Sequence, residues 1–373
     1  MMGNRISPFQ LYCLLMFMIM SSTAIFEPPH LIRAGGNNGW ILAWFCALVA
    51  LPYSLVYSAL ASKANIGLVP FFESSLGKWL AKALILSYLF FLIFSCALGL
   101  RMFFEFALSV VLFVVPVSVF AGFLLAAAAW AARRGLATIG RLAEVFFWTN
   151  TFGALLTAAL SCFNIDWNNF LPFVPRGILP LAPGAWKHSH VFAESYIAFF
   201  LSSFVSNRSR TYLSVLGSVL SSAFWICVFT LLSIGVFNHY LAGVLSYPIY
   251  SVVRNISVGD FIERVDAVFV AIWITNAFVK TSLLLFVIAH TSAAAVRLRD
   301  YRFLVLPFAL LIGALSIAMF RNTVELKFFY DFFFYRVMLV FAVILPLVLL
   351  ILSWWRRNEC NDQKVPDSAS SAG

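Results

Sequence analysis

Two ionisable side chains stand inside long apolar segments of the sequence, where a charge is energetically expensive. Lys280 lies in an apolar run from 261 to 292, and Glu194 lies in another from 186 to 206. On membrane-insertion scales an unpaired lysine in such a run costs about 2.5 to 3.5 kcal/mol. Such groups usually face the interior of a helix bundle and mark ion or proton paths. We therefore predict a role in ion or proton coupling, with Glu194 as the partner of Lys280 or with the Lys280 ammonium in place of a bound cation.

Each of these residues also has a purely structural interpretation. Lys280 follows Asp266 by 14 residues, a distance of about 21 Å along a helix, and from there a lysine can extend to the cytoplasmic interface. Glu194 can hydrogen-bond to the backbone of an irregular helix. Both alternatives stay open on the sequence alone.

Other charged residues gather at the expected outer ends of apolar runs. Two of them have the spacing of a helix capping box, and two pairs have the i, i+4 spacing of helix ion pairs. This pattern favours anchoring of helix ends over ligand binding. The residues that we interpret as structural charge pairs are Arg101, Glu105, Asp260, Glu263 and Arg264.

Motifs for catalysis are absent from the sequence. There is no P-loop, no GxSxG and no HExxH. His188 and His190 are two residues apart and have no further nearby ligands, so we predict no metal site. We expect a protein that is not an enzyme, with no catalytic residues, no cofactor and no nucleic-acid partner.

The amino-acid composition indicates whether these residues lie in a water-soluble protein or in a membrane protein. The chain has 373 residues, of which 62% are hydrophobic and 11% are charged. A water-soluble fold of this length cannot bury so much apolar surface. We therefore predict an all-α membrane protein with ten transmembrane helices of about 20 residues or more. The ten runs are approximately 9–34, 40–61, 80–107, 115–132, 138–163, 186–206, 211–237, 261–292, 303–320 and 335–355.

The charge distribution indicates how these helices are oriented. With the N-terminus inside, 15 lysines and arginines fall in cytoplasmic segments and 8 in outer segments, which is the positive-inside pattern. The net charge of +10 therefore mostly orients helices, although basic loops also attract anionic membrane lipid. We expect a multi-pass integral membrane protein with both termini in the cytoplasm. Residues 1–355 would form one transmembrane domain, and 356–373 a short polar cytoplasmic tail.

Two of the expected spans carry helix breakers. The first contains MSSTAIFEPPHLIRAGG at 20–36, and the sixth is preceded by PLAPGAW at 180–186. Proline removes a backbone donor and pushes the preceding residue away from helical geometry. We predict interruptions in both spans, each opening a half of five helices, with repeat one at about 9–163 and repeat two at about 186–355. This layout is typical of inverted-repeat transporters that bind ligands at the two breaks.

Broken helices offer a particular chemistry to a ligand. Their free N–H groups attract a carboxylate and their free carbonyls attract an ammonium. A zwitterionic amino acid satisfies both. The hydroxyls of Ser21, Ser22 and Thr23 could add contacts, although such small polar residues also let helices pack closely.

Five short segments share their order and spacing with one known family. They are ISPFQL at 6–11, LGKWLAK at 76–82, LGLRMFFEF at 98–106, FAES at 192–195 and GDFIERVDAVFVAIWI at 259–274. Together they resemble the spore-germination permease family, which supplies the B subunits of nutrient germinant receptors in endospore-forming bacteria. The resemblance covers about residues 5 to 355.

The resemblance implies the ten-helix fold of the amino-acid/polyamine/organocation superfamily, a location in the spore inner membrane, and sensing of a small nutrient, often an amino acid. It also implies an A-type and a lipoprotein C-type partner subunit. The ligand would lie between helices 1 and 6 and spans 3 and 8. Many relatives have glycines where this chain has Ser-Ser-Thr, which is a departure from the pattern. The implied ligand-binding residues are Ser21, Ser22, Thr23, Ala24, Tyr88, Cys96, His190, Phe192 and Glu194.

Three functions remain compatible with the sequence. The favoured one is a nutrient-sensing receptor subunit, in which ligand binding shifts the bundle between states. The alternatives are a stand-alone, proton-coupled amino-acid secondary transporter and a membrane scaffold subunit without a ligand of its own. The fold by itself does not decide among them.

Overall fold

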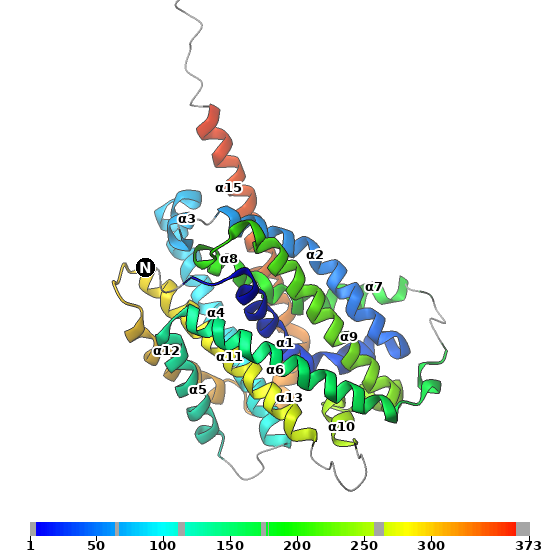
Figure 1. Ribbon diagram of the computed structural model, residues 1–373. Coiled ribbons are helices and arrows are strands. Elements are labelled where there is room, and N and C mark those ends of the chain that lie inside the picture. Colours follow the sequence, from blue (N-terminus) through cyan, green and yellow to red (C-terminus); the bar gives the residue numbers. More distant parts are fainter. Residues whose placement is uncertain are drawn as a thin grey trace, which may run out of the picture.

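The computed structural model describes residues 5–63, 67–110, 116–172, 177, 179–256 and 265–362. Every named element in these ranges is a helix (Figure 1). Seven helical stretches of this part of the chain are long and apolar enough to cross a membrane: Pro8–Lys63, Lys78–Val110, Val117–Arg134, Leu136–Asn164, Arg208–Val244, Asp266–Ala295 and Thr323–Trp354. The first stretch contains two helices, and the apolar helix Arg302–Ala318 is shorter. The count of ten spans and the division into two repeats stay predictions.

The long helices carry the fold, and short helical turns connect them. The α-helices of the first half are α1 (Pro8–Gly35), α2 (Gly39–Lys63), α3 (Leu68–Leu76), α4 (Lys78–Val110), α5 (Val117–Arg134) and α6 (Leu136–Ser161). Those of the second half are α7 (Ala182–His188), α8 (Ile197–Leu201), α9 (Thr211–Val244), α10 (Pro248–Arg254), α11 (Val265–Ala295), α12 (Arg302–Ala318), α13 (Thr323–Phe329), α14 (Tyr335–Met338) and α15 (Leu345–Asp362). The 3₁₀ turns are η2 (Gly36–Asn38), η3 (Cys162–Asn164), η4 (Trp167–Phe170), η5 (Leu179–Leu181), η6 (Ser189–Tyr196), η7 (Ser202–Phe204) and η8 (Arg208–Arg210), and two π-helical turns are η10 (Tyr330–Phe334) and η11 (Leu339–Ile344).

Two helices form the centre of the bundle. α1 packs against α9, α11, α2 and α6, and α11 packs against α6, α4, α5 and α12. In Figure 1, α1 (dark blue) runs through the middle of the molecule. Its buried residues lie on every side of the helix, which is the pattern of a helix enclosed by others.

The start of α1 is fixed by local and distant contacts. Ser7 and Gln10 form a capping box, with both hydrogen bonds at 3.1 Å, which satisfies backbone donors at the helix end. The Gln10 side-chain amide also donates to Glu144 on α6 at 3.0 Å. Ile6 pairs with the backbone beside Val205, just after η7. The ISPFQL segment therefore ties α1 to the end of the sixth region.

The predicted interruption of the first span is wrong, because α1 is one continuous helix from Pro8 to Gly35. Pro28 and Pro29 lie inside it. The two prolines lie in the final third of the helix and are buried by its neighbours, and such packing lets a membrane helix continue through proline. The Thr23 hydroxyl donates to the Ile19 carbonyl within the same helix at 2.6 Å.

The sixth region, which we call segment six, is irregular and covers residues 182–204. It passes from α7 through the 3₁₀ turn η6 to α8 and then η7. Every residue of η6 is buried. Hydroxyl groups support the tighter turns by donating to carbonyls three residues back, at 2.7 Å from Ser195 to Phe192 and 2.9 Å from Ser202 to Phe199. Segment six is thus narrower than an α-helix at the level where it contacts α1.

The last helical region begins before and ends after the predicted span, although its stretch that is long and apolar enough to cross a membrane, Thr323–Trp354, ends at about the predicted residue. It starts with α13 at Thr323, contains the π-helical turns η10 and η11, and ends with α15 at Asp362. The predicted span was 335–355. The polar tail expected from 356 therefore begins inside α15.

Candidate functional site

The two charges singled out in the sequence form a buried ion pair. The Lys280 ammonium on α11 donates to both carboxylate oxygens of Glu194 on η6, at 2.8 and 2.7 Å. Its third hydrogen bond goes to the Ser22 hydroxyl on α1 at 2.7 Å. Lys280 is 6% exposed and Glu194 is 8% exposed. This triad joins three elements that are far apart in the sequence.

All three donors of the Lys280 ammonium have acceptors, which is its full capacity. Lys280 therefore does not extend to the membrane interface, as its structural alternative required. Removing one partner of a buried pair leaves an uncompensated charge and typically costs about 3 to 5 kcal/mol. The triad thus holds α1, segment six and α11 together in this arrangement.

Little space remains beside the triad. A cavity of about 10 Å³ lies there, lined in part by Ser21, Cys96, Gly99 and Lys280. Such a volume accommodates at most about one water molecule. An amino acid does not fit unless the surrounding helices move.

Four other residues of the predicted ligand site do not meet at the triad. The Tyr88 hydroxyl donates to the Phe341 carbonyl at 3.0 Å. Thr23 bonds within its own helix, Phe192 is buried in the core, and Ala24 lines a separate apolar cavity. The structure therefore brings together Ser22, Glu194 and Lys280, with Ser21 and Cys96 nearby.

His190 belongs to a second buried cluster that the sequence reasoning did not identify. Its centre is Glu27 on α1, whose Oε1 lies 2.5 Å from Nδ1 of His188. The His188 ring lies 6.5 Å from the ring of His190 and 5.8 Å from the ring of His30. We call Glu27, His188 and His190 the outer cluster. The signal that could have found it is the one used for Glu194: a carboxylate inside an apolar run.

A polar cavity of about 100 Å³ adjoins this cluster at the C-terminal end of α1. It is lined by both cationic and anionic side chains, so opposite charges face the same space. The Arg101–Glu105 ion pair borders it at 3.5 Å, and Nδ1 of His30, which accepts a hydrogen bond from Arg33, lies 3.4 Å from Asp331 Oδ1. Its polar lining includes His30, Arg33, Glu105, Ser246, Tyr247, Thr323, Lys327, Tyr330 and Asp331.

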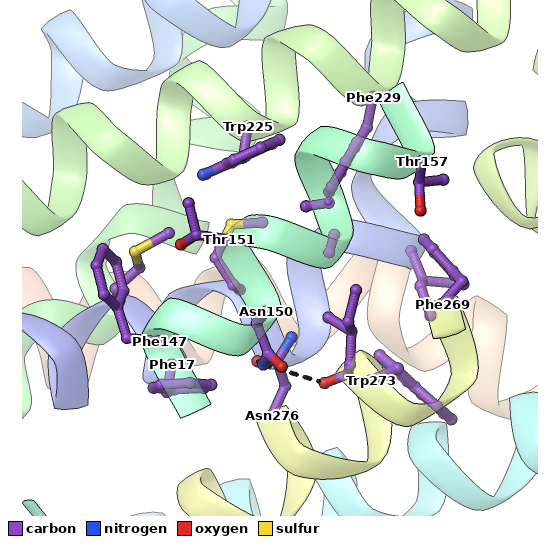
Figure 2. A pocket seen from close by; sticks show the side chains of 16 residues that line it. Phe17, Phe147, Asn150, Thr151, Thr157, Trp225, Phe229, Phe269, Trp273 and Asn276 are labelled. Carbon is purple, nitrogen blue, oxygen red and sulfur yellow. Dashed lines mark hydrogen bonds between the residues drawn. The ribbon is translucent and has the colours of Figure 1, made fainter. Parts of the chain in front are cut away.

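A third cavity, of about 60 Å³, is mostly apolar and lies between α1, α6, α9 and α11. Figure 2 shows Asn150 and Asn276 close together on one side of it, with Trp225 and Phe229 across from them. The Asn150 amide donates to the Asn276 carbonyl oxygen at 3.1 Å. Apart from Ala24, none of the predicted site residues lines this cavity.

The predicted structural charges divide into two groups. Arg101 and Glu105 lie on α4, and Glu105 also accepts a hydrogen bond from Thr323. Arg101 donates to the Ile317 carbonyl at 3.2 Å. Asp260, Glu263 and Arg264 lie outside the described residues, so the predicted capping box stays a prediction.

Comparison with known proteins identifies related sequences. A family model for "Spore germination protein" matches residues 5–324. Spore germination protein KB of Bacillus subtilis (strain 168) is 23% identical over 366 residues, covering 96% of this chain and 97% of the relative. Spore germination protein YndE of the same organism is 24% identical over 232 residues, covering 60% of this chain and 61% of the relative.

Solved structures with the same fold are membrane transporters. A substrate-bound, outward-open Na⁺-coupled sialic acid symporter superposes with a TM-score of 0.71 at 11% identity, covering 94% of this chain and 79% of the symporter. MhsT in complex with L-phenylalanine superposes with a TM-score of 0.60 at 16% identity, covering 94% of this chain and 89% of MhsT. At these identities the similarity establishes the fold. The seven apolar helical stretches of the described residues, together with the family match, show an integral membrane protein.

Proposed function

The chain belongs to the spore germination protein family, and from this premise we propose that it is the nutrient-sensing membrane subunit of a spore germinant receptor. Its ligand would be a small zwitterion such as an amino acid. It would act in the spore inner membrane with an A-type and a lipoprotein C-type subunit. The observation that carries the proposal is the Lys280–Glu194–Ser22 triad, which joins α1, η6 and α11 deep in a transporter fold.

The triad has the charges that a zwitterion needs. A ligand carboxylate can replace Glu194 at the Lys280 ammonium, while a ligand ammonium binds the released Glu194 carboxylate. The buried charges then stay paired throughout, which avoids the cost of an isolated buried ion. Because the cavity beside Lys280 is only about 10 Å³, the ligand enters only when the ion pair separates. Binding therefore favours a conformation in which α1, segment six and α11 have moved apart, and this movement is the signal.

Ligand-induced thermal stabilisation of the purified chain tests this proposal. An amino acid that binds the folded protein stabilises it by RT ln(1 + c/Kd) at free ligand concentration c, so its Tm rises with the logarithm of the ligand concentration above Kd. We expect stabilisation by at least one member of an amino-acid panel, and loss of that stabilisation in Lys280→Met and Glu194→Gln. Lys82→Met is the matched control, since Lys82 lies exposed on α4. Unchanged stabilisation in both triad variants would contradict the proposed site.

A stand-alone proton-coupled transporter is the second candidate, because the similar solved structures include a Na⁺-coupled symporter and a manganese transporter. Flux measurements on the chain alone separate it from a sensor. Proteoliposomes without partner subunits would accumulate labelled amino acid if the chain transports, and would only bind it if the chain senses. A scaffold subunit would show neither flux nor thermal stabilisation by any amino acid.

A further inference from the structure

The outer cluster differs from the triad because it contains polar atoms without partners. Glu27 is 1% exposed and His190 is 4% exposed. Glu27 Oε2 and His190 Nε2 are both buried and have no hydrogen-bond partner among the described residues. Leaving a buried polar group unpaired typically costs about 1 to 3 kcal/mol, and more when the group is charged. Two such groups in one cluster require an explanation.

The hydrogen bond at Nδ1 of His190 indicates whether its unpaired Nε2 is a donor or an acceptor. Its Nδ1 lies 2.8 Å from the Lys187 carbonyl oxygen. A carbonyl only accepts, so Nδ1 carries the hydrogen and donates. In the neutral ring Nε2 is then an acceptor. Glu27 Oε2 is also an acceptor when the carboxylate is ionised. The outer cluster therefore contains two unpaired acceptors and lacks a donor.

A proton supplies this missing donor without needing a cavity. No group of three or more His, Cys, Asp or Glu side chains in the described part of the chain has the arrangement of a metal site. A proton bound at His190 Nε2 converts an acceptor into a donor and turns the ring into an imidazolium. The added positive charge then offsets the buried negative charge of the Glu27 carboxylate, which is costly when it is unbalanced.

Two side chains that line the polar cavity lie beside rings of the outer cluster. His30 and Tyr330 both line that cavity. The His30 ring lies 5.8 Å from the His188 ring, and the Tyr330 ring lies 6.2 Å from the His190 ring. The Arg33 guanidinium donates to Nδ1 of His30 at 3.0 Å. The side chains of His30 and Tyr330 thus lie between the polar cavity and the outer cluster.

We propose that Glu27, His188 and His190 form a binding site for one proton, which is supplied from the polar cavity past His30 and Tyr330. A hydronium ion in that cavity loses a proton by breaking one O–H bond and becomes water, and a new N–H bond forms at His190 Nε2. This site is separate from the Lys280–Glu194 pair and does not depend on a nutrient. The charged and titratable groups facing it are His30 and Arg33 on α1, Cys46 and Tyr53 on α2, Lys187 on α7, Glu194 on η6, Tyr330 and Asp331 on η10, and Tyr335 on α14.

Histidine NMR of the full chain in lipid nanodiscs tests the proposal directly. The chain has only 5 histidines, so ring labelling with ¹³C and ¹⁵N gives few signals, and single His→Gln variants assign them. Between about pH 5 and 8, the usual range of histidine titration, we expect one transition that changes the His188 and His190 signals together. Glu27→Gln abolishes this joint transition, because the paired charge is gone. His239→Gln is the control and leaves it unchanged, since His239 lies on α9 beside Gly36.

Two results would overturn the proposal. In the first, neither His188 nor His190 titrates in this range. In the second, both titrate but their signals change independently and Glu27→Gln has no effect. If Glu27→Gln does not fold, His188→Gln serves instead, since removing that ring must also change the titration of His190. No nutrient is present in this experiment, so its outcome is independent of the proposed ligand.

Discussion

α1 and segment six meet at two levels, and the two levels differ in how their charges are satisfied. At the first, Ser22 and Glu194 share the Lys280 ammonium, and every donor of that ammonium has an acceptor. At the second, about 7.5 Å further along α1, Glu27 contacts His188, and Glu27 Oε2 has no partner in the described residues.

The two levels are similarly buried, so burial alone does not explain the difference. A complete set of hydrogen bonds makes the triad a rigid joint in the absence of ligand, because separation without a ligand exposes an unpaired charge. An incomplete set leaves the outer cluster able to accept a proton. The comparison therefore assigns a mechanical role to the first level and a proton-binding role to the second.

The largest effect is expected from breaking the triad. Lys280→Met leaves the Glu194 carboxylate buried and uncompensated, so we expect a loss of about 3 to 5 kcal/mol in unfolding free energy. Thermal unfolding of the detergent-solubilised protein measures it as a large decrease in Tm. The double variant Lys280→Met/Glu194→Gln removes both charges and should recover most of the loss. If the double variant is as unstable as the single one, the ion pair is not what joins the helices.

The sequence predicted the triad in part because its signal is local. A lysine and a glutamate inside apolar runs are visible without a structure, and their cost implies a partner. The choice of Ser22 as the third member was not predictable among Ser21, Ser22 and Thr23. It depends on how α1 is rotated toward α11, and packing between distant segments sets that rotation.

The outer cluster and the continuity of α1 were not predicted, and one cause explains both. Pro28 and Pro29 favour a helix break locally, so Glu27 was interpreted as part of a break rather than as a buried charge. Tertiary packing overrides the local effect of proline in α1. In segment six no proline lies within η6, yet the backbone departs from α-helical geometry there. The membrane class, by contrast, follows from composition alone.

A smaller loss of stability is expected when the triad loses one hydrogen bond. Ser22→Ala removes one hydrogen bond to the Lys280 ammonium, which keeps its two bonds to Glu194. The expected loss is about 1.5 to 3 kcal/mol, because the bond is made to a charged group. Thr23→Val is the matched control, since the Thr23 hydroxyl bonds only to its own helix. Equal changes in Tm for the two variants would show that Ser22 acts through helix packing rather than through the ammonium.

A still smaller change in stability is expected from a substitution in the outer cluster. Glu27→Gln weakens the contact to His188 but replaces the carboxylate, with its unpaired Oε2, by a neutral amide that has donors, so gain and loss partly cancel. We expect a change of less than about 1 kcal/mol in unfolding free energy at neutral pH. Chemical or thermal unfolding of the purified variant measures it. A loss as large as that of Lys280→Met would mean that both levels are structural joints.

The smallest effect on ligand binding is expected from the apolar cavity, which is lined by no residue of the triad or of the outer cluster. Ala154→Leu places extra methyl groups in this cavity on α6 without touching Lys280, Glu194 or Glu27. If the ligand binds where the ion pair separates, its affinity should change by less than about twofold, since no ligand contact is lost. Amino-acid binding measured by thermal shift decides this. Complete loss of binding in a well-folded Ala154→Leu protein would instead locate the ligand among the aromatic side chains of the apolar cavity, and the two levels of the α1–segment six contact would then act only on conformation.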